Sequence, residues 1–197
     1  MRSLGEAVLS ALSTDDSRLD RREADLVTEI CDRAAQRRAA ALEMPVPYAR
    51  KLIDRAKANL VWAYEHCDSP IERRLLPALV FANYGEGFAS FPAQIHCPKL
   101  DIAPPLGDLV IIPQFAFVRY RLDFAIIAEA EGRKKFVAVE CDGQDYHKDA
   151  DNDRARDEYL KAFGFDVFRF NGPEIQADPL SLATKVGMHL ADWRASL

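Results

Sequence analysis

The sequence lacks several features that would assign the protein to a specialised class. No apolar run approaches the ~20 residues of a membrane-spanning helix, so we expect no membrane partner. The four cysteines are scattered and form no C-x-x-C pair, which indicates neither a disulfide framework nor a zinc ribbon. The first residues contain no convincing signal-peptide cleavage site, and we therefore expect a cytoplasmic location.

An excess of basic residues is also missing. The formal net charge is -5, which argues against a protein that coats nucleic acid through bulk positive charge. A nuclease is not excluded, because a metal-binding carboxylate cluster adds negative charge of its own and a basic rim can coexist with an acidic total.

Helical periodicity dominates the N-terminal part of the chain. From about Asp16 to Glu43 apolar residues recur at three- to four-residue or seven-residue intervals, which predicts an amphipathic helix. Pro45 and Pro47 end it, and a second apolar stripe predicts another helix that ends near Cys67. We expect residues 1–68 to form a helical extension and residues 69–197 to form the main domain.

The main domain should alternate helices and strands. Ser69-Pro70-Ile71-Glu72 opens a helix, since it has an N-cap serine, a first-turn proline and a glutamate three residues after the cap. That helix should run to about Ala82, and the next should begin at Asp149 or Asp151 and end at Gly164, with a last helix from Asp178-Pro179. Strands are predicted at Phe88–Cys97, Leu109–Ile112, Phe117–Ile127, Phe136–Glu140 and Phe165–Phe170. The order predicts an α/β fold with a central mixed β-sheet flanked by helices.

Two carboxylates in apolar strands suggest a functional site. If a two-residue turn at Glu131-Gly132 joins the central strands, Asp123 faces Glu140 and Arg121 faces Asp142. Opposed residues in an antiparallel pair have Cβ atoms ~5 Å apart, close enough for both carboxylates to bind one Mg²⁺ or Mn²⁺. Without a cation the two charges would repel one another, so the arrangement itself suggests a metal.

These residues and those around them resemble a known family. The ordered set resembles restriction-endonuclease-like domains related to the very-short-patch repair endonuclease, a group within the PD-(D/E)XK nuclease superfamily. The resemblance covers roughly Ser69 to Met188. The residues that carry it are Ser69-x-x-Glu72, Gln94, Arg121-x-Asp123-Phe124, Val139-Glu140-x-Asp142-Gly143-x-x-x-His147, Asp153-x-x-Arg156, Leu160, Gly164 and Val167-x-Arg169-Phe170.

The resemblance implies a restriction-endonuclease-like core that cleaves phosphodiester bonds in DNA with Mg²⁺ or Mn²⁺. Asp123 and Glu140 would hold the metal, with Asp142 as a further metal contact and Glu72 as an additional catalytic acid. The metal would lower the pKa of its water and offset charge on the transition state.

The superfamily usually places lysine where this chain has Asp142, so the lysine role is either missing or moved. His147 would replace it as the general base, with Lys148 as a second candidate. The expected substrate-binding residues are Arg121, Arg156, Arg169, Lys148 and Gln94.

Several of these residues also have purely structural explanations. Glu72 fits a capping box that requires no catalysis, and Asp142-Gly143 fits a strand-ending turn with Arg121 as the salt-bridge partner of Asp142. His147 and Arg156 fit a solvated helix start rich in acids. Asp123 and Glu140 are harder to explain in this way, because each interrupts an apolar strand where an unpaired charge is costly.

Two functions are therefore compatible with the sequence. The first is a metal-dependent endonuclease. The second is a catalytically weak or inactive module of the same fold that binds nucleic acid or a partner protein. In either case residues 1–68 could form a DNA-binding arm, a homodimer contact, a partner-protein contact or a regulatory lid.

Overall fold

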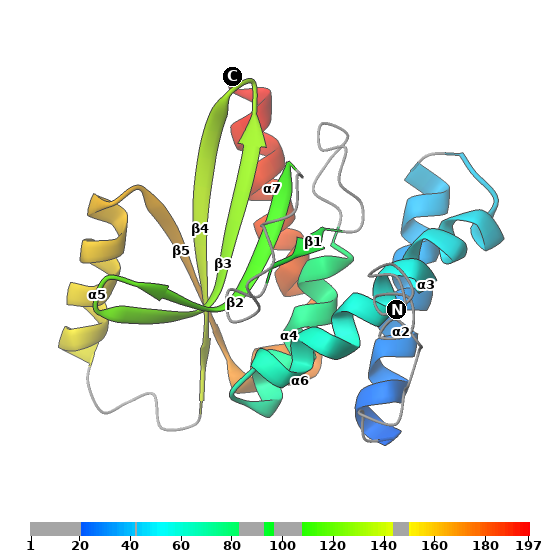
Figure 1. Cartoon of the computed structure of the whole chain (residues 1–197), viewed down its shortest axis with the longest axis horizontal. Coiled ribbons are helices and arrows are strands. Elements are labelled where there is room, and N and C mark those ends of the chain that lie inside the picture. Colours follow the sequence, from blue (N-terminus) through cyan, green and yellow to red (C-terminus); the bar gives the residue numbers. More distant parts are fainter. Residues whose placement is uncertain (1–20, 42, 83–92, 97–107, 144–149) are drawn as a thin grey trace, which may run out of the picture.

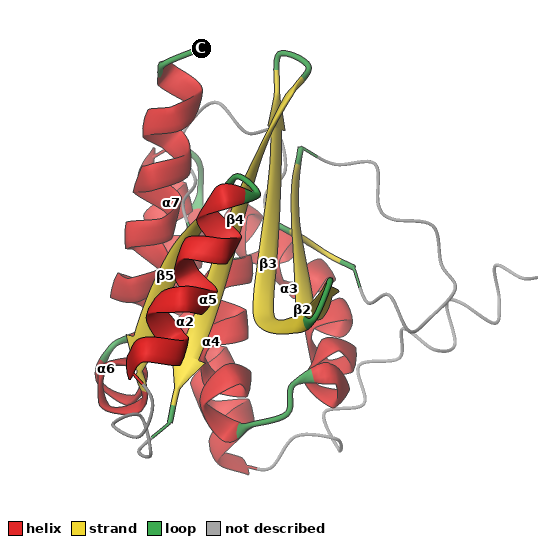
Figure 2. Ribbon diagram, turned by 90° about the vertical axis from the view of Figure 1, so that its left-hand side faces the viewer, coloured by secondary structure: helices red, strands yellow, loops and turns green. Residues whose placement is uncertain are grey.

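A computed structural model describes residues 21–41, 43–82, 93–96, 108–143 and 150–197. These residues form an α/β fold in which helices flank a mixed five-stranded sheet of order β1-β2-β3-β4-β5, so the predicted fold class is confirmed. Figures 1 and 2 show the sheet with α5 on one side and the other helices on the opposite side.

The helices expected at the N-terminal side are present. Helix α2 spans Arg21–Ala41, α3 spans Val46–Ala63, and a 3-10 turn, η2, follows at Tyr64–His66. The start predicted at Asp16 lies outside the described residues. Pro45 is the N-cap of α3, as expected of a residue that cannot continue the preceding helix.

The helices of the main domain follow the predicted order, with one addition. They are α4 at Pro70–Val80, α5 at Ala150–Ala162, α6 at Gly172–Ala177 and α7 at Pro179–Ala195. Ser69 caps α4, Asp178 caps α7, and Gly164 has a φ of +85° just after α5. Helix α6 was not predicted, although Asn171 and Glu174 form a complete capping box at its start.

The strands differ more from the prediction. They are β1 at Gln94–Ile95, β2 at Leu109–Phe117, β3 at Tyr120–Ala130, β4 at Arg133–Asp142 and β5 at Phe165–Asn171. The expected strand Phe117–Ile127 is wrong at its start, because the chain turns at Val118-Arg119 and Phe117 belongs to β2. The alternation of apolar residues continues through this tight turn, which hid it in the sequence.

The register between β3 and β4 agrees with the prediction from the turn as far as Phe124 and Val139, whereas the predicted pairs of Asp123 with Glu140 and of Arg121 with Asp142 are not part of the ladder. The strands are antiparallel and joined by a two-residue turn, with Ala130 opposite Arg133 and Phe124 opposite Val139. Glu131 and Gly132 both have positive φ, at 52° and 73°, which is the backbone of a type I′ hairpin turn.

The two faces of the sheet bury separate apolar clusters. Val110, Ala125 and Ala138 pack with Leu160 of α5, whereas Ile111, Ile126 and Val137 face α4 and α7. Strands β2 and β3 bend toward α5 at their joined end (Figure 1), where aromatic pairs such as Phe117 with Phe163 hold them to the helix.

The bend interrupts the regular alternation of β3. Leu122 packs on the α5 side but Phe124 packs on the opposite side, although residues two apart normally share a face. On β2, Gln114 has a φ of 51° and lies between Pro113 and Phe115, which pair with Phe124 and Leu122 of β3. The irregular positions of both strands are therefore next to one another, at Gln114 and Asp123.

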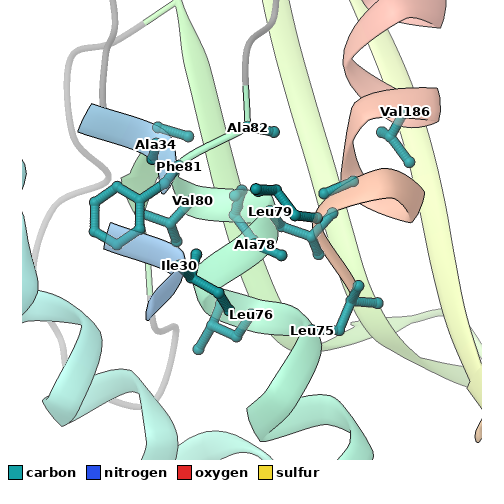
Figure 3. Close-up of a cluster of buried hydrophobic side chains, with 14 of the residues drawn as sticks. Ile30, Ala34, Leu75, Leu76, Ala78, Leu79, Val80, Phe81, Ala82 and Val186 are labelled. Carbon is teal, nitrogen blue, oxygen red and sulfur yellow. The ribbon is translucent and has the colours of Figure 1, made fainter. Parts of the chain in front are cut away.

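The buried side chains of α2 and α3 are continuous with the core of the main domain. Ile30 and Ala34 of α2 lie near Leu76 and Val80 of α4, and Val186 of α7 lies on the other side of α4 (Figure 3). The helices before residue 68 and those after it therefore share one buried apolar cluster across the domain boundary that we expected there. No described helix is long and apolar enough to cross a membrane.

Candidate active site

The two carboxylates predicted to face one another lie just past the end of the paired region of β3 and β4. The strand ladder is continuous up to Phe124 and Val139, and Asp123 and Glu140 are the next residues in each strand. Glu140 shares the α5 face with Ala138 and is only 3% exposed. The backbone N–H of Cys141 donates to Oδ2 of Asp123 at 2.7 Å, which fixes this carboxylate against β4.

Both carboxyl groups are harder to ionise than usual. Burial raises the pKa of Asp123 to about 6, and the neighbouring charges of Glu72 and Asp142 act in the same direction. Burial and the nearby Asp123 charge raise the pKa of Glu140 to about 8. A site in which two acids resist ionisation is one that an additional positive charge would stabilise.

Arg156 of α5 supplies part of that positive charge. Its Nη2 lies 2.8 Å from each carboxylate oxygen of Glu140 and donates at 2.7 Å to the carbonyl of Arg121. Its Nε is buried and has no hydrogen-bond partner among the described residues. The guanidinium therefore holds α5 against the acids and retains one buried donor.

Arg169 of β5 forms ion pairs with three further acids. Its guanidinium lies 3.1 Å from Asp142, 2.8 Å from Asp157 and 3.5 Å from Asp153. Burial raises the pKa of Asp142, with the Arg169 charge acting against that rise. The predicted pairing of Asp142 with Arg121 is wrong, because Arg121 forms its ion pair with Asp68 at 2.6 Å. The β3-β4 ladder ends at Phe124 and Val139, so the register counted from the turn no longer applies to Arg121 and Asp142.

Glu72 is buried at the start of α4, beside this cluster. Its carboxylate accepts from the Asp68 N–H at 2.9 Å, from the Ser69 hydroxyl at 2.7 Å and from Nε2 of Gln114 at 2.7 Å. The capping interaction expected from the sequence is present, since the Glu72 N–H also donates to Oγ of Ser69 at 3.3 Å. Glu72 thus ties α4 to the bend of β2.

A family comparison covers most of this arrangement. Residues 107–190 match the model of the REase_MTES_1575 family, a restriction-endonuclease-like domain family. The match spans less than half of the 197 residues, and it indicates a nuclease. No curated protein and no solved structure shows significant similarity to the chain.

The matched segment contains the central acids and arginines but not the whole cluster. Asp123, Glu140, Asp142, Arg156 and Arg169 lie inside it, whereas Glu72 and the N-terminal helices precede it.

For three other predicted site residues the structure does not describe the side chain, and a fourth lies outside the cluster. His147 and Lys148 lie outside the described residues. Gln94 lies in β1, as predicted, but its side chain is not described. Arg121 is largely exposed and meets the cluster only through its backbone carbonyl.

The sequence prediction gave no role in the site to three residues of the cluster. Gln114 follows Pro113 in an apolar run, and its polarity there was the available signal. Asp153 and Asp157 stand four residues apart on α5, a spacing that places both on the helix face toward Arg169.

The described side chains provide an incomplete metal site. No group of three histidine, cysteine or acidic side chains among them is arranged to hold a metal. Mg²⁺ nonetheless retains several waters in proteins and needs only one or two carboxylates together with substrate phosphate. Asp123 and Glu140 could supply these two carboxylates. Their raised pKa values show that a nearby cation would stabilise their charged forms.

Proposed function

We propose that the protein is a Mg²⁺- or Mn²⁺-dependent endonuclease that hydrolyses phosphodiester bonds in DNA. The observation that carries the proposal is the neighbouring pair of half-buried Asp123 and buried Glu140, whose pKa values are both raised, inside the segment that matches restriction-endonuclease-like domains. Paired buried acids with perturbed pKa values are typical of a catalytic site. The more specific relationship to the very-short-patch repair endonuclease is part of the proposal.

Asp123 and Glu140 would hold the metal ion. The bound ion would lower the pKa of a water molecule and neutralise charge that develops on the phosphate. The Cys141 N–H keeps the Asp123 carboxylate oriented, so only Glu140 must exchange its present cation, Arg156, for the metal. Asp142 is held by Arg169 and would serve as an outer metal contact.

Arg156 would hold the DNA phosphate. Once released from Glu140, Arg156 can direct its guanidinium, including the buried Nε–H, toward a phosphate oxygen. Arg169 would remain a positioning residue, because three aspartates surround it. His147 is our proposed general base, with Lys148 as the second choice.

The test is cleavage of plasmid and single-stranded DNA, and of RNA, by the full chain with Mg²⁺ or Mn²⁺. Glu140→Gln and Asp123→Asn should each lower the cleavage rate by more than about 100-fold, since they remove ligands of the ion itself. Glu129→Gln is the matched control, because Glu129 is exposed in β3 at the opposite end of the hairpin. Cleavage that persists in Glu140→Gln would refute the proposal.

One specific observation favours the alternative, a catalytically weak or inactive module. Asp142 replaces the usual lysine and is already paired with Arg169, while Arg156 contacts both oxygens of Glu140. In that case calorimetry would detect no Mn²⁺ binding while DNA or partner binding persisted. Mn²⁺ binding that disappears in Glu140→Gln would instead support the endonuclease.

A further inference from the structure

A pocket lies between residues of α2, η2, α4 and α6. Figure 1 shows these helices on the side of the sheet away from α5. The pocket has a volume of about 520 Å³, and we call it the arginine pocket. Its lining residues are Arg22, Glu23, Leu26, Tyr64, Pro70, Ile71, Arg73, Arg74 and Gln176.

The charge of the pocket is positive. Three arginines line it against one glutamate, and that glutamate, Glu23, lies 3.4 Å from Arg73. Arg74 donates from Nε to the Ile175 carbonyl at 3.2 Å and from Nη2 to the Gln176 carbonyl at 2.8 Å. A guanidinium has five N–H donors, so Arg74 is fixed in place and still has donors for a ligand.

The hydroxyl of Tyr64 is an independent indication that the pocket binds a ligand with a hydrogen-bond acceptor. Its side chain is 4% exposed, and its hydroxyl is buried without a hydrogen-bond partner among the described residues. Burial raises the pKa of Tyr64 well above its ordinary value, so the hydroxyl keeps its proton and remains a donor. A buried donor beside arginines is suited to the oxygen of an anion.

The pocket is close to the candidate active site. A Cβ added to Gly172 would lie 3.7 Å from the Asp142 carbonyl oxygen and 3.8 Å from Cγ2 of Ile71, a pocket residue. On α4, Arg73 and Arg74 directly follow Glu72, which contacts the bend of β2. The two sites therefore share the first turns of α4, and a helix is about 10 Å wide, a width that a short run of nucleotides can span.

We propose that the arginine pocket binds a backbone phosphate of the nucleic acid strand whose neighbouring phosphodiester lies at Asp123 and Glu140. The proposal rests on the proposed function for the second of these positions. It gives α2 a defined part in substrate binding, since Arg22 and Glu23 come from that helix. The recognised group is a phosphodiester, and the sequence of bases plays no part in it.

The experiment measures binding rather than cleavage. The full chain is titrated in EDTA, so that it cannot cleave, against a fluorescein-labelled 20-base-pair duplex and the corresponding single strand, at several salt concentrations. Arg22→Gln should weaken binding roughly 3- to 10-fold at low salt and lower the salt slope by about one. Arg133→Gln, an exposed arginine at the β3-β4 turn, is the charge-matched control and should bind like wild type.

Tyr64→Phe supplies a second variant with a different signature. Because the hydroxyl has no partner in the free protein, its removal should leave thermal stability unchanged or higher while DNA binding weakens. A separate arm adds inorganic phosphate. If phosphate stabilises the wild type but not Arg22→Gln while DNA affinity is equal in both, the pocket takes free phosphate and the proposal is wrong.

The other outcomes are equally decisive. Equal weakening by Arg22→Gln and Arg133→Gln would overturn the proposal in favour of general electrostatic attraction. Cleavage of DNA by the wild type, with no effect of Arg22→Gln on binding, would overturn the pocket and leave the endonuclease standing. Weakened binding in Arg22→Gln without any cleavage by the wild type would support the pocket and count against the endonuclease.

Discussion

Arg156 is the residue on which the state of the candidate active site depends. It is the cation that contacts both oxygens of Glu140, and it occupies the place where a divalent ion would need to bind. A metal ion and a guanidinium repel one another, so metal binding must displace Arg156 from Glu140 or weaken the contact.

The substitution Arg156→Gln should therefore separate metal binding from activity. We expect Mn²⁺ affinity to rise about 10-fold, a change of about 1.4 kcal/mol, because the competing cation is gone. DNA cleavage should fall at least 10-fold, because the phosphate contact is lost. Isothermal titration calorimetry and a plasmid assay measure the two effects.

Arg154→Gln is the control for this prediction, since Arg154 is exposed on the same helix. It should change neither the Mn²⁺ affinity nor the cleavage rate. If Arg156→Gln weakened Mn²⁺ binding instead, Arg156 would support the metal site rather than compete with it.

At the scale of elements, the start of α4 is stabilised by the side chain of Glu72. Three donors, from Asp68, Ser69 and Gln114, depend on its carboxylate. Glu72→Ala should lower the free energy of unfolding by about 2–3 kcal/mol, since three partly buried hydrogen bonds lose their acceptor. Ser69→Ala should cost about 1 kcal/mol, the usual cost of a lost N-cap.

Urea denaturation followed by circular dichroism measures both changes. Glu158→Ala, at an exposed position of α5, should stay within about 0.5 kcal/mol of wild type. Should Glu72→Ala prove as stable as wild type, the hydrogen bonds around Glu72 contribute little, and its place beside Asp123 would need a functional explanation.

The elements that could be predicted are those with local signals. The β3-β4 turn was predictable because Glu131-Gly132 interrupts the strand pattern and glycine tolerates positive φ. The turn at Val118-Arg119 contains no glycine or asparagine, and Val118 has a φ of 52°, so the sequence hid it. Helix α6 is short and carries no apolar stripe, which left its capping box unnoticed.

The partners of the charged residues could not be predicted in the same way. Asp123 and Glu140 were identifiable because charges in apolar strands are rare. The contacts of Arg156 and Arg169 depend on how α5 lies across β4 and β5, which is a tertiary feature. The sequence therefore indicated which residues were candidates but paired Asp142 with the wrong arginine.

At the scale of the whole molecule, one buried cluster joins the N-terminal helices, α4, α7 and one face of the sheet, whereas Glu140 contacts Arg156 of α5. The stability of the molecule should respond to the charge state of Asp123 and Glu140, because burial disfavours the charged form of each. Asp123 and Glu140 bind protons more tightly in the folded chain than in the unfolded chain, since their pKa values rise from 3.8 to about 6 and from 4.5 to about 8.

Stability without metal should consequently fall as the pH rises. Below about pH 4 both groups are protonated in the folded and unfolded states, and the stabilisation of the protonated folded form is fully present. It is lost through the window from about pH 4 to pH 8 as each group passes its folded pKa. For Asp123 alone the loss is on the order of 3 kcal/mol, or roughly 6–12 °C in Tm.

Other carboxylates change stability with pH as well, so the comparison must be made between variants. In EDTA the wild type should lose more Tm between pH 5 and pH 8.5 than Asp123→Asn/Glu140→Gln, while the Glu129→Gln control follows the wild type. Adding Mn²⁺ at pH 8.5 should raise the Tm of the wild type and of the control only, because ligand binding to the folded state stabilises it. Identical pH profiles for wild type and double variant would mean that the two acids are ionised without cost, and the physical reason for a metal at this site would disappear.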